Sequence, residues 1–120
     1  MEETYFITSE RLKKELDFFR KEKKFLTKPN KKLESLENVY IFQPAFIEVI
    51  ETIAEKMSTL EIKKFISDLE EFINKSPYNI EEKDTLLWAL ELWKVSPDLS
   101  FLKMLNAAKA RKNRIHSVLK

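Results

Sequence analysis

The residues of this chain best suited to binding a ligand are the basic ones near its C-terminal end. Residues 101–120 contain six lysine or arginine side chains and no aspartate or glutamate. In a helix these cations would surround an apolar face. Cations placed in this way neutralise nucleic-acid phosphates, and because counterions are then released, such binding weakens as salt is added. The candidate phosphate-binding residues are Lys103, Lys109, Arg111, Lys112, Arg114 and Lys120.

A second basic cluster lies near the N-terminal end and adds the candidates Arg20, Lys21, Lys23 and Lys24. Residues 1–32 carry a net charge of +4, residues 33–100 of −8 and residues 101–120 of +6. Such segregation predicts that the acidic and basic parts face different neighbours, within the fold or between subunits. An alternative interpretation is that the basic ends are ordinary solvated surface. Cations near a helix C-terminus complement the helix macrodipole by about 0.3–1 kcal/mol each.

Few side chains of the kinds that carry catalysis or hold metals are present. The chain has no cysteine and one histidine, which excludes thiol nucleophiles and the usual zinc sites. It has no glycine, which argues against phosphate-binding loops, because they need a residue that tolerates positive φ. The acidic residues without a matching ligand motif, interpreted as solvated helix faces, are Glu70, Glu71, Glu81, Glu82 and Asp84. We therefore expect no cofactor, no metal site and no catalytic residue.

Four aromatic side chains are candidates for stacking on nucleic-acid bases: Tyr40, Phe42, Trp88 and Trp93. The two tryptophans lie in a stretch, residues 86–93, that is apolar almost all round a helix. A helix of that kind is usually central and buried. The pattern therefore favours a place in the core for both tryptophans.

Apolar residues recur at helical spacing along most of the chain. The first half predicts a helix over residues 9–26, capped by Thr8 or Ser9, and a short helix over residues 33–38. Phe18 and Phe25 form a second apolar line on the first helix, which suggests that this helix contacts two partners. Residues 39–42 are β-prone, and no partner strand is evident for them.

The second half of the chain shows clear helix starts. One helix is predicted from Pro44 to about residue 57, and the next from a capping box, Ser58 with Glu61, to about residue 74. Two more follow, from an Asn79 cap to about residue 95 and from Ser96 nearly to the C-terminus. These elements predict an all-α fold, a compact helical bundle of four long helices plus one or two short ones, in a single domain spanning residues 1–120.

No basic and apolar leader and no apolar run of about 18 residues is evident in the sequence. We therefore expect a cytoplasmic protein that does not associate with membranes.

The spacing of Arg111 and His116, an arginine followed after four residues by a histidine, resembles the HEPN family of small helical ribonucleases. The resemblance implies that the two side chains help a ribose 2′-hydroxyl attack the adjacent phosphate across a dimer interface, without a metal. On a regular helix, however, residues five apart point about 140° from each other. Lys112 also stands where that family usually has asparagine or another polar residue.

The nine residues from Met57 to Phe65 are similar to a short signature of the small helical subunit of CRISPR type III effector complexes. The resemblance implies a helical bundle without an active site, which contacts nucleic acid through basic residues within a larger assembly. Charge segregation suits such a role, because the acidic and basic faces of neighbours can meet.

These observations together predict a non-enzymatic helical subunit of a nucleoprotein assembly, with RNA or DNA backbone as its partner and self-association as a further feature. The basic C-terminal helix and the Arg20–Lys24 cluster would form its phosphate-binding surface. One alternative is a protein-binding module or inhibitor that uses an acidic central surface, formed by Glu48, Glu51, Glu55, Glu81, Glu82 and Asp84. The other alternative is the ribonuclease.

Overall fold

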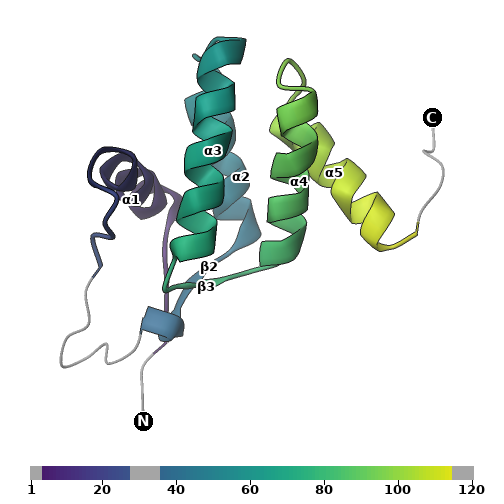
Figure 1. Ribbon diagram of the computed structural model, residues 1–120. Coiled ribbons are helices and arrows are strands. Elements are labelled where there is room, and N and C mark those ends of the chain that lie inside the picture. Colours follow the sequence, from purple (N-terminus) through teal and green to yellow (C-terminus); the bar gives the residue numbers. More distant parts are fainter. Residues whose placement is uncertain (1–3, 28–35, 115–120) are drawn as a thin grey trace.

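The structure, a computed structural model, describes residues 4–27 and 36–114 and is mainly helical (Figure 1). Its α-helices are α1 (Ser9–Glu22), α2 (Gln43–Ala54), α3 (Thr59–Lys75), α4 (Lys83–Val95) and α5 (Phe101–Lys112). A 3-10 turn spans Leu36–Asn38, and three short strands are β1 (Tyr5–Phe6), β2 (Val39–Ile41) and β3 (Asn79–Ile80). The predicted helical bundle is confirmed.

Helix α3 lies near the middle of the molecule, with α1 on one side and α4 and α5 on the other (Figure 1). Helix α3 packs against α1 on one side and α4 on the other, while α2 contacts both α1 and α5. Helices α4 and α5 pack antiparallel: the Trp93 ring at the end of α4 lies 5.4 Å from the Phe101 ring at the start of α5, and Lys112 at the end of α5 lies 3.8 Å from Glu82 at the start of α4. As a result α1 and α5 lie at opposite sides of the molecule (Figure 1).

The β-prone stretch that was expected to have no partner is the middle strand of a small parallel sheet, in the order β1-β2-β3. Tyr5 pairs with Val39, and Tyr40 pairs with Asn79. The expectation was wrong because β1 and β3 contain only two residues each, too few for a recognisable pattern. Each strand leads into a helix, so the sheet gathers the N-terminal ends of α1, α2 and α4.

Helix α1 is capped by Thr8, whose hydroxyl accepts a hydrogen bond from the Arg11 backbone N–H at 3.2 Å. It ends four residues before the predicted boundary, because Lys23 adopts a left-handed conformation with φ of 58°. Phe25 therefore lies beyond the helix, and its ring packs 5.2 Å from Phe19 and 5.4 Å from Phe72. The idea that Phe25 forms a second binding line on α1 is wrong, because its ring belongs to the core.

Helix α3 starts with the predicted capping box. The Ser58 hydroxyl accepts a hydrogen bond from the Glu61 N–H at 3.2 Å, and the Glu61 carboxylate accepts one from the Ser58 N–H at 3.2 Å. The bond from the Ser58 backbone holds the pKa of Glu61 below its ordinary value. Two of the helix's otherwise unpaired N–H groups are thereby satisfied.

Replacing Ser58 with alanine removes the hydroxyl acceptor and is expected to lower the free energy of unfolding by about 1 kcal/mol. Urea titration followed by circular dichroism measures the change. Ser67, an exposed residue in the middle of the same helix, supplies the matched control. A change at Ser67→Ala as large as that at Ser58→Ala would contradict the capping role.

Helices α4 and α5 begin later than predicted. Asn79 belongs to β3, and α4 starts after Glu82, which is left-handed with φ of 50°. Helix α5 is capped by Ser100, whose hydroxyl accepts from the Lys103 N–H at 3.2 Å. Residues 96–100 instead form a turn, held by the Trp93 indole N–H, which donates to the Leu99 carbonyl at 2.8 Å.

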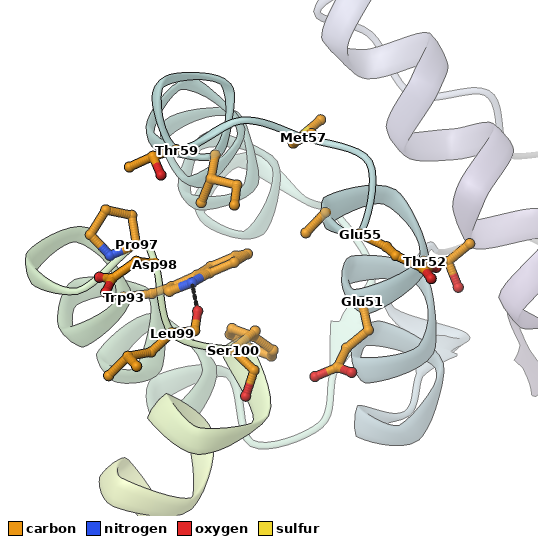
Figure 2. A pocket seen from close by; sticks show the side chains of 13 residues that line it. Glu51, Thr52, Glu55, Met57, Thr59, Trp93, Pro97, Asp98, Leu99 and Ser100 are labelled. Carbon is orange, nitrogen blue, oxygen red and sulfur yellow. Dashed lines mark hydrogen bonds between the residues drawn. The ribbon is translucent and has the colours of Figure 1, made fainter.

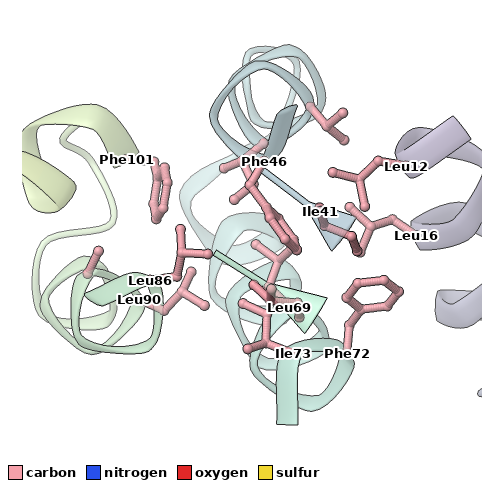
Figure 3. Packing of buried hydrophobic residues seen from close by; sticks show 14 of the residues in the cluster. Leu12, Leu16, Ile41, Phe46, Leu69, Phe72, Ile73, Leu86, Leu90 and Phe101 are labelled. Atoms are coloured by element: carbon pink, nitrogen blue, oxygen red, sulfur yellow. The ribbon is translucent and has the colours of Figure 1, made fainter. Parts of the chain in front are cut away.

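One apolar core runs through the bundle (Figure 3). The Phe72 ring lies edge-on to Phe19 at 5.4 Å and to Phe46 at 6.2 Å. Trp93 is buried, as predicted, but Trp88 is 38% exposed, so its predicted place in the core is wrong. Trp88 and Trp93 are five residues apart on α4 and therefore point to different sides.

Candidate functional site

The basic residues of α5 mostly face solvent. Lys103, Arg111 and Arg114 are exposed and Lys109 is partly exposed. Within residues 4–27 and 36–114, none of these four side chains forms an ion pair. Lys120, the remaining distal candidate, lies outside the described residues. Helix α5 buries Phe101, Leu105 and Ala108, so the bundle fixes the helix while these cations remain accessible.

Lys112 is engaged inside the molecule. Its ammonium group lies 3.8 Å from the Glu82 carboxylate and donates to the Thr85 hydroxyl at 3.3 Å. Both partners lie at the start of α4, which the antiparallel packing brings beside the end of α5. Of the predicted cations on α5, Lys112 is therefore the one that helps to hold the two helices together.

The cations of α5 surround the helix instead of forming a stripe. At about 100° per residue, Lys103, Lys109 and Arg111 point in three different directions. Lys109 and Arg111 are about 3 Å apart along the axis, and Lys103 is about 9 Å from Lys109, at 1.5 Å per residue. We define the basic end of α5 as Lys109, Arg111 and Arg114.

The predicted cluster on α1 is divided between internal pairs and free surface. Arg20 lies 3.3 Å from the Asp68 carboxylate, and Lys23 lies 3.5 Å from Asp68 and 3.2 Å from Glu71. The hydrogen bond to Glu71 is the main reason why the pKa of Lys23 lies above its ordinary value. Lys21 and Lys24 are exposed, and neither pairs with a carboxylate in the described part of the chain.

The structure does not bring the two predicted basic clusters together. Helix α1 lies at one side of the molecule and α5 at the other (Figure 1). A single straight backbone could not contact both along one face. The basic end of α5 and the pair Lys21 and Lys24 are therefore separate surfaces.

Most of the carboxylates that were interpreted as solvated have specific partners. Glu70 pairs with Lys94 at 2.7 Å, and this hydrogen bond raises the pKa of Lys94. Glu81 accepts a hydrogen bond from the Gln43 N–H at 3.0 Å. Among the residues that the structure describes, no three histidine, cysteine or acidic side chains gather as metal ligands would. His116, the partner of Arg111 in the ribonuclease alternative, lies outside those residues.

Two of the predicted stacking aromatics form an exposed patch at the sheet. The Tyr40 and Phe42 rings are stacked with centroids 6.2 Å apart and an interplanar angle of 17°. Phe6, which sequence reasoning missed, lies 6.1 Å from Phe42 and is 65% exposed. A β1 of two residues carries no pattern that would have indicated its position beside Tyr40.

A cleft of about 710 Å³ lies where α2, the start of α3 and the turn before α5 meet (Figure 2). Glu51 and Glu55 line it from α2, and Asp98 lines it from the turn between α4 and α5. No lysine or arginine is among its lining residues. Glu51 and Glu55 were predicted members of an acidic surface, but Asp98 was not, because only the folded turn brings it opposite α2.

No helix in the described part of the chain is long and apolar enough to cross a membrane. Neither a protein-family model, nor a curated protein, nor a solved structure matches this chain.

Proposed function

We propose that this chain is a non-enzymatic helical subunit of a nucleoprotein assembly, and that it binds nucleic-acid backbone through α5. The observation that carries the proposal is the set of accessible cations on that helix, Lys103, Lys109 and Arg111, with Arg114 just after its end, which have no carboxylate partner within the described residues. Unpaired cations on a helix that is itself fixed to a bundle can meet phosphates without first breaking an internal ion pair.

The helix macrodipole accounts for only part of this pattern. Lys109, Arg111 and Lys112 lie in the last turn of α5, where each cation gains about 0.3–1 kcal/mol from the helix dipole. Lys103 lies in the first turn, three residues after the Ser100 cap, where the dipole disfavours a cation. A phosphate-binding role accounts for both positions, whereas the dipole accounts for one.

The α1 cluster has a smaller part in this proposal than the sequence predicted. Arg20 and Lys23 already contact Asp68, and a phosphate would have to compete with that buried carboxylate. Lys21 and Lys24 keep the ability to meet a second stretch of backbone on the far side of the molecule. We assign the main contact to α5 and an accessory one to Lys21 and Lys24.

The kind of assembly is suggested by one short segment. Residues Met57 to Phe65, whose likeness is to the small subunit of CRISPR type III effector complexes, form the capped start of α3. That start supports the fold of the bundle and does not itself contribute to the basic surface. A CRISPR effector complex is therefore the assembly that we propose to test first.

The test is the salt dependence of binding to labelled single-stranded RNA and duplex DNA, measured by fluorescence anisotropy. Reversing Lys103, Lys109 and Arg111 together to glutamate is expected to weaken binding at least about tenfold at about 50 mM salt, and to reduce the slope of log K against log salt by about 3 for duplex DNA and about 2 for single-stranded RNA. The reason is that binding releases about one counterion fewer for each phosphate contact that the variant has lost.

The matched control reverses Lys13, Lys14 and Lys63, which are exposed, lie away from α5 and have no ion pair in the described part of the chain. It changes the net charge by the same amount and is expected to retain most of the affinity and slope. Equal losses in both triple variants, binding that ignores salt, or no binding to either nucleic acid would each overturn the proposal.

A further inference from the structure

The cleft beside α5 has acidic walls. Glu51 on α2 and Glu55, directly after its end, are exposed and one helical turn apart, and Asp98 is exposed on the facing turn (Figure 2). With no basic side chain among the lining residues, the three carboxylates are not neutralised from within the cleft. Their combined field attracts cations and repels the phosphates of a nucleic acid.

Part of the lining is apolar, and we call this part the floor. It includes Ala54, Met57 and Ile62, which are partly exposed, and Trp93 and Phe101, which are buried. Apolar surface in the centre with charged groups around it is the arrangement found at protein–protein interfaces. A small cation would leave this floor in contact with water.

The cleft is already formed in the free chain. The Trp93 indole N–H donates to the Leu99 carbonyl at 2.8 Å, which fixes the turn that makes one wall. The Glu51 carboxylate accepts a hydrogen bond from the Leu102 N–H at 3.3 Å, which ties the other wall to the start of α5. An occupant would therefore not have to meet the entropic cost of ordering these walls.

Exposed apolar side chains lie in the cleft and next to its lining residues in the sequence. Leu99 lines the cleft and is 40% exposed, while Leu102, next to the lining residue Phe101, is 41% exposed and Leu60, next to the lining residue Thr59, is 78% exposed. Leu60 and Leu102 add exposed apolar surface to that of the lining itself. This extension indicates a chain segment as the occupant.

We propose that this acidic cleft, lined by Glu51, Glu55 and Asp98 over an apolar floor, is the docking site for a basic, amphipathic segment of a partner protein. The segment would place apolar side chains on the floor and lysine or arginine against the walls. Glu51 and Glu55 are about 6 Å apart along α2, so two cations at that spacing, one helical turn apart, match them. Charge complementarity of this kind favours fast association and one orientation of the segment.

This site is distinct from the basic end of α5, and of the cations proposed to bind nucleic acid only Lys103 belongs to the end of α5 that borders the cleft. The cleft lies at the start of α5, whereas the basic end of α5 lies at its other terminus. The acidic cleft and the basic end of α5 lie at opposite ends of that helix, so the chain can bind a basic protein segment and an acidic backbone at the same time. The two functions can therefore fail separately in experiments.

The probe is a fluorescein-labelled synthetic peptide of about four helical turns, with lysine at every fourth position and leucine on the face between. Reversing Glu55 and Asp98 together to lysine is expected to weaken its binding at least about tenfold in fluorescence anisotropy. Glu51 is left unchanged because its carboxylate also binds the Leu102 N–H. A peptide with serine in place of leucine is expected to bind the unaltered protein at least about tenfold more weakly, because the floor then gains no apolar contact.

The matched control reverses Glu22 and Asp84, two exposed carboxylates away from the cleft, and is expected to keep the affinity within about twofold. Tryptophan emission supplies a second measurement. In a Trp88→Phe background Trp93 is the only tryptophan, and peptide binding is expected to shift its emission. Reversal of Lys109 and Arg111 to glutamate is expected to leave peptide binding unchanged, which separates this site from the proposed nucleic-acid surface.

Five outcomes would overturn the proposal. Four are the absence of peptide binding, equal loss in the control pair, equal binding of the leucine-free peptide, and displacement of the peptide by spermine at equal charge concentration. The fifth is self-association of the unaltered protein that the Glu55 and Asp98 reversals abolish, because the occupant would then be a second copy of this chain.

Discussion

Replacing Glu15 with alanine is expected to lower the free energy of unfolding by about 3–5 kcal/mol. Glu15 is completely buried, and its carboxylate accepts hydrogen bonds from the backbone N–H groups of Leu26 at 3.0 Å and Thr27 at 3.1 Å. It also accepts hydrogen bonds from the Thr27 hydroxyl at 2.7 Å and the Tyr78 hydroxyl at 2.9 Å. Alanine would leave the buried Tyr78 hydroxyl and the partly buried donors of Leu26 and Thr27 without this acceptor.

The carboxylate joins α1, the segment that follows it and the end of α3 into one unit. Burial is the main reason why the pKa of the Tyr78 phenol lies above its ordinary value, and the charge of Glu15 adds to the effect. Tyr78 therefore remains a hydrogen-bond donor throughout the ordinary pH range. The loss of Glu15 is expected to loosen Phe25 as well, since its ring lies 5.6 Å from Tyr78.

Urea unfolding of the Glu15→Ala variant measures this effect. The control is Glu22→Ala, an exposed glutamate at the end of the same helix, with an expected change within about 0.5 kcal/mol. The free energy of unfolding of the Glu15→Gln variant should lie between those of the two alanine variants. The amide keeps one oxygen acceptor but presents an NH₂ group to the surrounding donors. Similar stability of the Glu15→Ala and Glu22→Ala variants would show that the buried carboxylate is not required.

The burial of Glu15 could be predicted from the sequence in part. Leu12, Leu16 and Phe19 recur at helical spacing, which predicts one apolar stripe on α1, and all three are completely buried. Glu15 lies on the same arc, three residues after Leu12, so a buried charge was detectable in principle. Its partners were not, because Leu26 and Thr27 reach it only after Lys23 turns the chain.

Features that depend on neighbouring residues were predictable, and features that depend on distant ones were not. The capping box at Ser58 needs four consecutive residues and was found. The sheet needs two-residue strands from three parts of the chain and was missed. Starts of α4 and α5 were misplaced because Asn79 and Ser96 resemble caps locally but are used in a strand and a turn.

The same distinction applies to the candidate sites. The charge segregation that marked α5 is a property of sequence, and the exposure of Lys103 and Arg111 agrees with it. The pairing of Arg20 with Asp68 joins residues 48 positions apart and could not be seen. Asp98 likewise became part of the acidic cleft only through the turn between α4 and α5.

Asp68 is expected to make the fold sensitive to acid. Its carboxylate is 5% exposed and meets Arg20 at 3.3 Å, Lys23 at 3.5 Å and Lys64 at 3.1 Å. Burial alone would raise the pKa of Asp68, but the hydrogen bonds from Lys64 and Arg20, with the charges of Lys64 and Lys23, outweigh it and hold the pKa below its ordinary value. Folding therefore favours the ionised form.

The lowered pKa of Asp68 determines how the free energy of unfolding changes with pH. An aspartate whose pKa is lower in the folded state contributes stability above its unfolded pKa, near 3.9, and loses it as the pH falls through its folded pKa. At neutral pH, Asp68→Asn is expected to lower the free energy of unfolding by about 2–3 kcal/mol, since the hydrogen bonds involve charged groups while the cations stay partly in water. As the pH falls below about 4, the difference between the variant and the unaltered protein should shrink.

Urea unfolding of both proteins between about pH 7 and pH 2 tests this expectation. The difference between them isolates Asp68 from other carboxylates with a lowered pKa, such as Glu61 and Glu71. Asp98→Asn, at an exposed aspartate without an ion pair in the described part of the chain, is the control and should match the unaltered protein at every pH. A difference between the Asp68→Asn variant and the unaltered protein that stays constant down to the lowest pH would contradict this expectation. The side chain would then act through its shape, and contacts other than its charge would hold the three cations around it.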